Sequence, residues 1–169
     1  MTIDFASAQT TPKPLKADVD GAQIDLDDEG TVKGRAELSG ELFREGAKTH
    51  LRGTVTSEVD LLCTRCAKRL TRALKIDFED VFVDASGETR DKDLEIPVSD
   101  LNEQLVAENE IDLSEVIREQ ILLNLPEQVL CKEDCKGLCP QCRANLNLKD
   151  CDCGEEDIDP RWAALKDLN

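Results

Sequence analysis

Hydrophobic and polar residues alternate along much of the first half of the chain, from about residue 18 to residue 83. The clearest run has small or apolar residues at every second position: Leu51, Gly53, Val55, Ser57, Val59 and Leu61. Polar residues lie between them: Thr54, Thr56, Glu58 and Asp60. A period of two residues is typical of an antiparallel strand with one buried face, and the Thr and Val content favours a strand over a helix. We therefore predict a half-buried strand over residues 51–61.

A second alternating run follows after a gap that contains the sequence CTRC, residues 63–66. Its apolar members are Leu70, Leu74, Ile76 and Phe78. Two strand patterns on either side of a short gap favour a β-hairpin. We therefore expect Cys63 and Cys66 at or near the tip of that hairpin.

The segment IDLSEVIREQILLNLP, residues 111–126, has the period of an α-helix. Asp112 is the expected N-cap, and Glu115 stands in the capping-box position three residues later. Pro126 ends the helix because proline cannot continue the hydrogen-bond pattern. One face is apolar: Leu113, Val116, Ile117, Ile121 and Leu125. We expect this face to cover the apolar face of the sheet, so the helix is structural rather than catalytic.

The chain carries 37 acidic against 21 basic residues, which gives a formal net charge of −16. Such acidity argues against broad binding to a phosphate backbone, and it suits either a basic partner or solubility alone. The first residues lack the basic and apolar segments of a signal peptide, and no stretch reaches the roughly 18 apolar residues of a membrane span. We therefore expect a cytoplasmic protein without a membrane partner.

Six of the eight cysteines lie in one stretch, LCKEDCKGLCPQCRANLNLKDCDC, residues 130–153. In a reducing compartment, clustered cysteines favour a metal site over a disulfide framework. Zinc prefers four soft ligands in a tetrahedron, and two cysteines separated by two residues present their sulfurs to one side of the ion. We predict that zinc is bound by tail cysteines, namely Cys131, Cys135, Cys139, Cys142, Cys151 and Cys153. Cys63 and Cys66 are further candidates.

The spacing leaves three divisions of these cysteines open. In the first, one zinc takes Cys139, Cys142, Cys151 and Cys153, and another takes Cys63, Cys66, Cys131 and Cys135. In the second, one zinc takes Cys131, Cys135, Cys139 and Cys142, while the rest are free or form a looser site. In the third, the tail holds one zinc and the pair near residue 65 holds none. We favour a tail zinc that includes Cys139 and Cys142, and we treat the long-range site as a hypothesis.

Other chemistries fit the cysteines and the rest of the chain less well. Secreted disulfides and an iron–sulfur cluster remain chemically possible. A redox motif of the thioredoxin type begins a helix, whereas CTRC joins two strands as a zinc knuckle does. We expect no enzyme and no small-molecule substrate, because His50 is the one histidine and no phosphate loop or local Ser-His-Asp set is present. A zinc-dependent thiol redox sensor is the alternative function.

The sequence predicts an α+β fold: an antiparallel β-sheet with a covering helix, a small cysteine-rich zinc-binding tail and a short C-terminal helix. We expect a flexible arm at 1–16 and an α+β core at 17–128. An acidic linker at 84–110 lies within that core and holds at most one short helix, from Ser99 or Asp100. Residues 129–158 form the zinc-binding module, and residues 159–169 form the C-terminal helix. Trp162 in that helix either docks on the core or anchors a partner.

Residues 61–76 contain five bases and no acid, against the acidic average of the chain. The bases are Arg65, Lys68, Arg69, Arg72 and Lys75. On a hairpin they form a compact patch that can contact RNA phosphates, and we predict these five as nucleic-acid-binding residues. The alternative is a basic solvent face that pairs with acidic neighbours.

Several of these segments together resemble the bacterial YceD family of large ribosomal RNA subunit accumulation proteins. The shared features are CTRCAKRLTRAL, IDLSEVIREQILLNLP, CKGLCPQCRANLN with CDC, and the closing DPRWAALKDL. The resemblance implies a cytoplasmic, non-enzymatic protein that supports accumulation of large-subunit ribosomal RNA. It implies ribosomal RNA or a large-subunit ribosomal protein as partner, since genes of this family lie beside that of a zinc-ribbon ribosomal protein.

This chain departs from the family pattern at one position. Members often have Gly after the CPxC sequence, where this chain has Arg143, so we expect the turn to differ. Some members lack the tail cysteines. The resemblance therefore implies that the shared function depends on Cys63, Cys66, the basic hairpin and the terminal helix. On that basis we expect the tail zinc to stabilise the fold rather than to carry the function.

Overall fold

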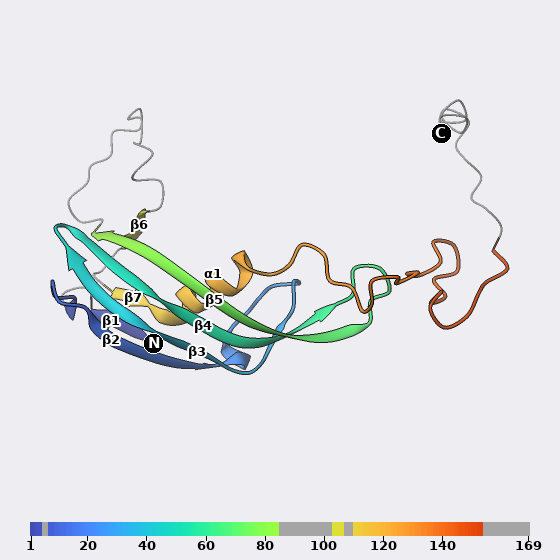
Figure 1. Cartoon of the computed structure of the whole chain (residues 1–169), viewed down its shortest axis with the longest axis horizontal. Helices are drawn as coiled ribbons and strands as arrows, with labels where there is room; N and C mark the ends of the chain where they lie inside the picture. The colour runs from blue at the N-terminus through green and yellow to red at the C-terminus, as the bar shows by residue number, and fades with distance from the viewer. Residues whose placement is uncertain (5–6, 85–102, 107–109, 154–169) are drawn as a thin grey trace, which may run out of the picture.

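The computed structural model describes residues 1–4, 7–84, 103–106 and 110–153, and all that follows concerns these residues. They form mainly β-structure with one α-helix (Figure 1). The strands are β1 (Thr2–Asp4), β2 (Lys13–Asp20), β3 (Thr31–Glu45), β4 (Lys48–Leu62), β5 (Arg69–Asp84), β6 (Glu103–Val106) and β7 (Glu110–Asp112). A 3-10 helix, η2 (Gly21–Gln23), follows β2, and α1 (Leu113–Leu123) follows β7.

The main sheet has five strands in the order β2-β3-β4-β5-β6. The pairs from β2 to β5 are antiparallel, whereas β6 pairs with β5 in parallel, so the sheet is not wholly antiparallel as predicted. The sheet is strongly curved along its length (Figure 1). Gly53 lies opposite Gly40, and a Cβ on Gly53 would lie 2.7 Å from the carbonyl oxygen of Ser39. Glycine therefore permits this close approach of β3 and β4.

Strand β4 confirms the predicted alternation. Leu51, Val55 and Val59 are fully buried, whereas Thr56 and Glu58 between them are exposed. Leu62 at the end of β4 pairs with Arg69 at the start of β5, so residues 63–68 form the hairpin tip. The prediction that CTRC lies at this tip is confirmed.

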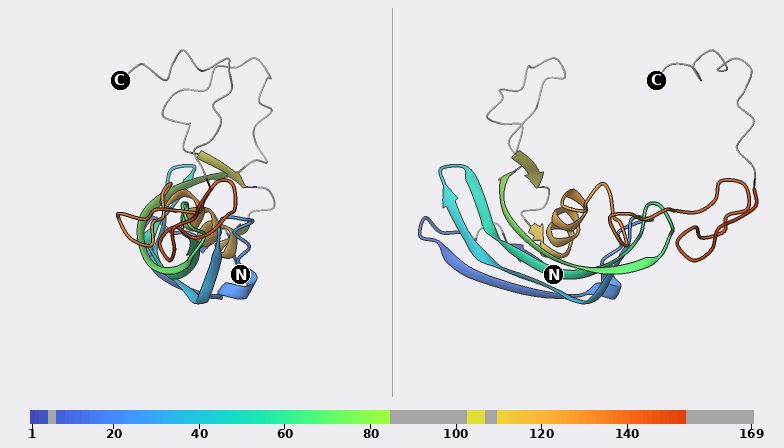
Figure 2. Two further views of the ribbon diagram at one scale, coloured as in Figure 1. Left: turned by 90° about the vertical axis from the view of Figure 1, so that its right-hand side faces the viewer. Right: turned by 45° about the vertical axis from the view of Figure 1, so that its right-hand side comes forward.

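Helix α1 lies on the concave side of the curved sheet (Figure 2). Its buried residues Leu113, Val116, Ile117 and Ile121 belong to the same hydrophobic core as the inward residues of the strands. Gln120 donates from Nε2 to the Asp80 carboxylate at 3.1 Å, which adds a polar contact between α1 and β5. Asp112 is the N-cap as predicted, because its Oδ1 accepts the N–H of Ser114 at 2.9 Å.

The first residues differ from the expected flexible arm. β1 pairs with β7, directly before α1, and β2 begins at Lys13 inside the predicted arm. The amino group of Met1 lies 3.2 Å from Oδ1 of Asp112, and the N–H of Leu113 donates to the Met1 carbonyl at 2.9 Å. These contacts with a distant segment hold β1 in place, and a local hydrophobic pattern does not reveal them.

The predicted acidic linker at 84–110 also contains structure. Residues Glu103–Val106 form β6, and Val106 is buried against the core. Backbone pairing with β5 explains why so short a segment forms a strand. The predicted helix start at Ser99 or Asp100, the C-terminal helix at 159–169 and Trp162 all lie outside the described residues.

Candidate metal centres

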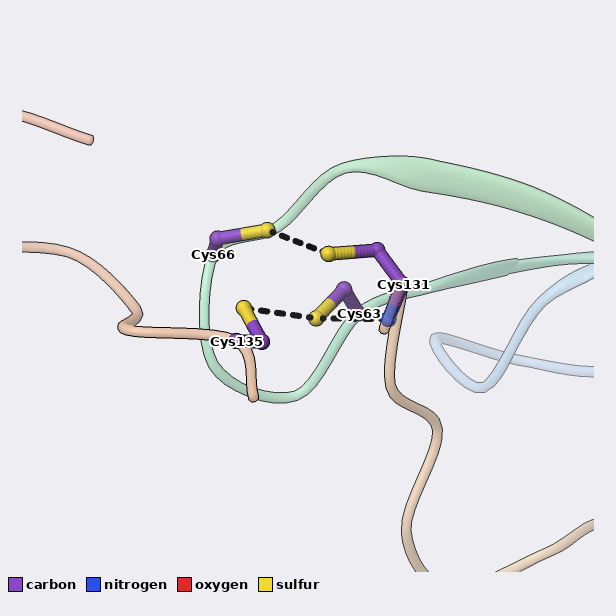
Figure 3. Close-up of side chains that lie close together, drawn as sticks. All are labelled: Cys63, Cys66, Cys131 and Cys135. Atoms are coloured by element: carbon purple, nitrogen blue, oxygen red, sulfur yellow. Dashed lines mark hydrogen bonds between the residues drawn. The ribbon is translucent and has the colours of Figure 1, made fainter. Parts of the chain in front are cut away.

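The structure brings Cys63 and Cys66 at the β4–β5 tip together with Cys131 and Cys135, which follow α1 (Figure 3). Each sulfur lies within 4.8 Å of the other three. The Sγ atoms of Cys63 and Cys135 are 3.8 Å apart, and those of Cys66 and Cys131 are 3.6 Å apart. The pair Cys63 and Cys135 is separated by 72 positions along the chain, so the fold rather than local spacing forms this first cluster.

These distances fit a tetrahedral thiolate site. Four sulfurs about 2.3 Å from a central zinc ion lie about 3.8 Å from one another, which is close to the two separations above. Three of the four cysteines are buried, with exposed fractions of 2% for Cys63, 6% for Cys66 and 2% for Cys135. The cluster can therefore hold one metal ion that is shielded from solvent.

Backbone and side-chain donors stabilise thiolates in the first cluster. Burial raises the pKa of Cys63, but backbone N–H groups of Cys66, Arg65 and Cys131 outweigh it and lower the pKa to about 6. The N–H of Cys131 lies 3.4 Å from the Cys63 sulfur. Burial and the neighbouring sulfur of Cys135 instead raise the pKa of Cys131 to about 12. The four thiols thus do not ionise together without added positive charge, which a divalent cation supplies.

The second cluster consists of Cys139, Cys142, Cys151 and Cys153, whose sulfurs also lie within 4.8 Å of one another. Backbone N–H groups of Cys142 and Gln141 lower the pKa of Cys139 to about 6. The neighbouring sulfur of Cys142, together with burial, raises the pKa of Cys153 to about 12. Cys139 is buried, whereas Cys142 is exposed. This cluster can also hold one metal ion, and it is more open to solvent than the first.

The two CxxC turns share the same pattern of backbone hydrogen bonds and a left-handed residue at the same position. The N–H of Ala67 donates to the Cys63 carbonyl at 2.9 Å, and the N–H of Arg143 donates to the Cys139 carbonyl at 2.8 Å. In both turns the N–H of the first cysteine donates to the carbonyl of the residue five positions later, also at 2.8 Å. Ala67 has a φ of 54° and Arg143 has a φ of 57°. Arg143 thus adopts the left-handed conformation that glycine prefers, and whether the turn differs from that of family members with Gly stays a prediction.

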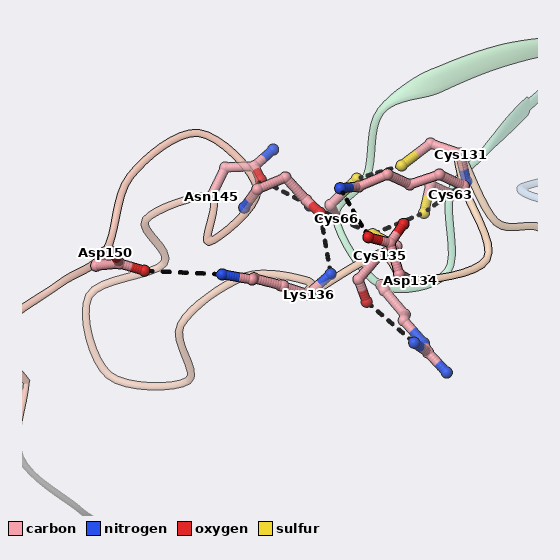
Figure 4. A network of polar contacts seen from close by, with 11 residues as sticks. Cys63, Cys66, Cys131, Asp134, Cys135, Lys136, Asn145 and Asp150 are labelled. Carbon is pink, nitrogen blue, oxygen red and sulfur yellow. Dashed lines mark hydrogen bonds and ion pairs between the residues drawn. The ribbon is translucent and has the colours of Figure 1, made fainter.

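A polar network joins the first cluster to the tail segment that contains Lys136, Asn145 and Asp150 (Figure 4). Arg65 donates from Nη1 to the Cys135 carbonyl at 3.0 Å, and Asn147 donates from Nδ2 to the Cys135 sulfur at 3.3 Å. Asn147 also accepts the N–H of Lys136 at 3.0 Å. Burial raises the pKa of Cys135, but Asn147 and the N–H of Gly137 outweigh it and lower the pKa. The sequence pattern assigned Asn147 no role, whereas the fold makes it a partner of the first cluster.

Of the three divisions that the spacing left open, the structure groups the sulfurs as in the first. The long-range cluster that the sequence offered only as a hypothesis is assembled, and the tail retains four cysteines of its own. The second division would combine Cys131 and Cys135 with Cys139 and Cys142, which here belong to different clusters. Two metal ions per chain therefore fit the geometry better than one.

The five predicted nucleic-acid-binding residues do not share one face. Arg65 and Lys68 lie in the hairpin turn, and both are exposed. Arg69 and Lys75 are exposed on β5. Their partners on β4, Leu62 and Thr56, are also exposed, so these positions lie on the outer face of the sheet.

Arg72 lies on the opposite side of β5 from Arg69 and Lys75. Its register partner is the buried Val59, and it shares its strand face with the partly buried Leu70 and Leu74. Its Nη2 lies 3.4 Å from the Leu130 carbonyl, so Arg72 connects the strand to the segment that enters the first cluster. The expectation of a single compact patch is wrong for Arg72. Arg72 is exposed nonetheless, and binding of nucleic acid by all five residues stays a prediction.

The side chain of His50 packs against its neighbours on the sheet. Its ring stacks on Phe43 with a centroid distance of 5.0 Å, and its side chain is 14% exposed. Glu79 lies 3.5 Å from its Nδ1. In the part of the chain that the structure describes, no helix has the length and apolar character needed to span a membrane.

Comparison with known proteins assigns the chain to a family. The model of the family described as large ribosomal RNA subunit accumulation protein YceD matches residues 51–169. The chain belongs to the YceD family. The matched region contains both cysteine clusters, strands β5 to β7 and α1.

Relatives of this YceD protein occur in a plant and in bacteria. The large ribosomal RNA subunit accumulation protein YCED homolog 1, chloroplastic, of Arabidopsis thaliana is 27% identical over 154 residues, which cover 78% of this chain and 48% of that protein. An uncharacterized protein of Mycobacterium tuberculosis is 29% identical over 186 residues, 99% of this chain and 81% of its own length. The uncharacterized protein YlbN of Bacillus subtilis is 27% identical over 139 residues, 81% of this chain and 72% of its own length.

The chain thus spans about half of the plant relative and most of the two bacterial relatives. No solved structure matches it.

Proposed function

We propose that this protein is a non-enzymatic factor of large-subunit ribosome biogenesis that acts in the cytoplasm. Its membership of the YceD family, with a match that includes both cysteine clusters, supports a role in accumulation of large-subunit ribosomal RNA. The proposed partner is large-subunit ribosomal RNA. Binding rather than catalysis fits the cysteine sites, because a metal that holds four thiolates has no open position for a substrate.

We propose zinc as the metal of both clusters. Four thiolates in a tetrahedron match the preference of zinc, and they give a closed site. Such sites supply folding free energy, on the order of 10 kcal/mol in small zinc peptides. Cys63, Cys66, Cys131 and Cys135 would hold the first ion, and Cys139, Cys142, Cys151 and Cys153 the second. The metal would thereby stabilise the position of the hairpin tip and of the tail.

The observation that carries the RNA proposal is a local excess of bases at the cluster end of an acidic protein. Figure 1 shows the β4–β5 tip and residues 130–153 at one end of the molecule. The exposed bases of the two segments there outnumber the exposed acids by six to four: Arg65, Lys68, Lys132, Lys136, Arg143 and Lys149 against Glu133, Asp134, Asp150 and Asp152. Bases concentrated in this way can contact phosphates even though the whole chain is repelled by them.

A charge reversal at this end tests the RNA proposal. We expect Lys68→Glu combined with Lys149→Glu to weaken binding of large-subunit ribosomal RNA by about tenfold at low salt, and to reduce the salt dependence of binding. The matched control reverses two exposed bases outside the hairpin tip and residues 130–153, on β2 and β3: Lys16→Glu and Lys33→Glu. Equal losses in both double variants would show that net charge, rather than the cluster end, determines RNA binding.

A thiol redox sensor is the second candidate function, and the exposure of Cys142 favours it at the tail cluster. The first cluster is buried and suits a static site better. If the tail acts as a sensor, mild peroxide should oxidise pairs of tail thiols to disulfides, with reduction of the peroxide to water. RNA binding should be lost on this oxidation, and a thiol reductant should restore it. RNA binding that does not change while the tail is oxidised and reduced would exclude this role.

A further inference from the structure

A groove lies beside the hairpin tip and is separate from both cysteine clusters. Three segments that are distant in sequence line it: residues 27–31 at the start of β3; residues 60–62, Thr64 and Arg69 at the β4–β5 tip; and residues 125–127 with Val129 after α1. Its volume is about 420 Å³. A cavity of this size can take one or two side chains of a bound segment.

Hydrogen bonds fix the walls of the groove. Both the backbone N–H and the hydroxyl of Thr64 donate to the Val129 carbonyl, at 2.8 Å and 3.1 Å. Arg118 donates to the Asp25 carbonyl at 2.6 Å and to the Asp27 carboxylate at 2.9 Å, which holds the loop before β3 against α1. The groove is therefore formed before any partner binds.

The floor of the groove is apolar. Leu61 and Val129 are buried beneath it, and Leu125 is partly buried at its side. Leu62 lines the groove and is 56% exposed, although it is a large apolar residue. An exposed leucine beside a preformed groove is a natural contact for an apolar part of a partner.

The rim of the groove is acidic. Five carboxylate residues line it: Asp27, Asp28, Glu29, Asp60 and Glu127. Arg69 is the one base among the described lining residues. Asp27 already pairs with Arg118, and Asp60 accepts the Thr71 hydroxyl at 2.5 Å. Asp28, Glu29 and Glu127 are exposed to solvent, so they can pair with cationic groups of a bound partner.

An apolar floor and an acidic rim together match one side-chain chemistry. Lysine and arginine carry an apolar stem and a cationic end, so they can lay the stem on apolar surface and keep the charge beside a carboxylate. We propose that this groove binds an extended segment rich in lysine or arginine, from a basic protein. Five carboxylates against one base disfavour a phosphate backbone, so RNA is not the occupant that we propose for this groove. The inference goes beyond the RNA contact proposed above and does not depend on it.

The test measures binding of a short fluorescein-labelled peptide in which lysine and glycine alternate, with the full, metal-loaded chain. The groove variant combines Glu29→Lys and Glu127→Lys. The control combines Glu37→Lys and Glu45→Lys, two exposed residues of β3 that do not line the groove. Both variants change the net charge by the same amount. If only the net charge of the chain mattered, both would therefore bind the peptide equally weakly. We expect the groove variant to bind about tenfold more weakly than the control. Equal affinities would overturn the proposal.

A second peptide tests the apolar floor. In this peptide diaminobutyrate, which has the same charge but a shorter stem, replaces each lysine. We expect the wild-type chain to prefer the lysine peptide by about threefold, because each buried CH₂ group contributes to binding. Leu62→Ser should remove this preference without changing the charge. A wild-type chain that binds both peptides equally would contradict the role of the floor, and unchanged unfolding temperatures would confirm that all variants are folded.

Discussion

The N–H of Leu138 donates to the carbonyl of Arg65 at 3.1 Å. Arg65 lies inside the first CxxC turn, and Leu138 directly precedes the second, so this hydrogen bond joins the two turns. The residue before Leu138 is Gly137, whose φ is 79°. A Cβ on Gly137 would lie 3.1 Å from the Arg65 oxygen. This hydrogen bond thus places the second turn against the first at the end of the sheet.

This contact predicts a specific effect of Gly137→Ala. The substitution combines a left-handed backbone, which costs about 1–2 kcal/mol for an L-residue, with close approach to a backbone oxygen. We expect a larger loss of unfolding free energy than the backbone cost alone, and weaker metal binding. Urea unfolding and metal competition measure both quantities.

Gly46→Ala is the matched control for Gly137→Ala. Gly46 has a φ of 61°, but a Cβ there would have nothing within 4 Å. It should therefore lose only the backbone cost of about 1–2 kcal/mol and keep full metal affinity. Equal effects of the two substitutions on metal binding would show that the Leu138–Arg65 contact does not couple the turns.

The left-handed conformation of Arg143 predicts that glycine is the better residue there. Arg143→Gly removes about 1–2 kcal/mol of backbone strain and adds about 0.5–1 kcal/mol of chain entropy to the unfolded state. We expect a net gain of about 0.5–1 kcal/mol in unfolding free energy. Arg143→Ala is the control, because it removes the same side chain but keeps the strain. A gain with Ala as large as that with Gly would contradict this explanation.

Asp112 should make stability depend on pH. The hydroxyl of Ser114 lowers the pKa of Asp112, helped by the Ser114 N–H and the amino terminus, and partial burial opposes them. Because the folded pKa lies below the unfolded one, the stabilisation is present above the ordinary pKa of an aspartate. It is lost as pH falls through the lowered folded pKa.

Two substitutions separate the cap from the charge of Asp112. Asp112→Ala should cost about 1 kcal/mol at neutral pH, because the N-cap is lost. Asp112→Asn keeps a good N-cap but cannot ionise, so it should cost less at neutral pH, and its difference from the wild type should vanish in acid. Unfolding curves between neutral and acidic pH measure this, and a difference that does not change with pH would refute the assignment.

The clusters should contribute unequally to core stability. Cys63→Ser removes a ligand from the cluster that links the β4–β5 tip to the chain after α1, so we expect a lower unfolding temperature of the core. Cys142→Ser affects only a local tail cluster and should leave that temperature nearly unchanged. Thermal unfolding followed by circular dichroism compares the two. A core that Cys142→Ser unfolds would mean that the tail is part of it.

Local patterns predicted much of the fold. The alternation along β4, the hairpin tip at CTRC and the N-cap at Asp112 depend on neighbours in sequence, and all three are present. β1, β6 and β7 were not predicted, because strands of three or four residues are too short for a pattern of their own and form by pairing with distant partners. The side of Arg72 follows from strand parity with Leu70 and Leu74, so that signal was present in the sequence.

The cysteine clusters show the same limit. The spacing around Cys139 and Cys142 indicated a tail site, because its ligands are close in sequence. No spacing rule connects Cys63 with Cys135, since the strands and α1 lie between them and only the fold brings their sulfurs together. Asn147 was missed for the same reason, because its role depends on the position of Cys135.

Metal analysis of the chain purified without chelator, with free thiols counted in the same sample, tests the central claim most directly. The two clusters predict two zinc ions per wild-type chain and no reactive thiols. Cys63→Ser and Cys142→Ser should each retain one zinc. One zinc per wild-type chain, with several thiols free to react, would contradict a metal centre at the hairpin tip.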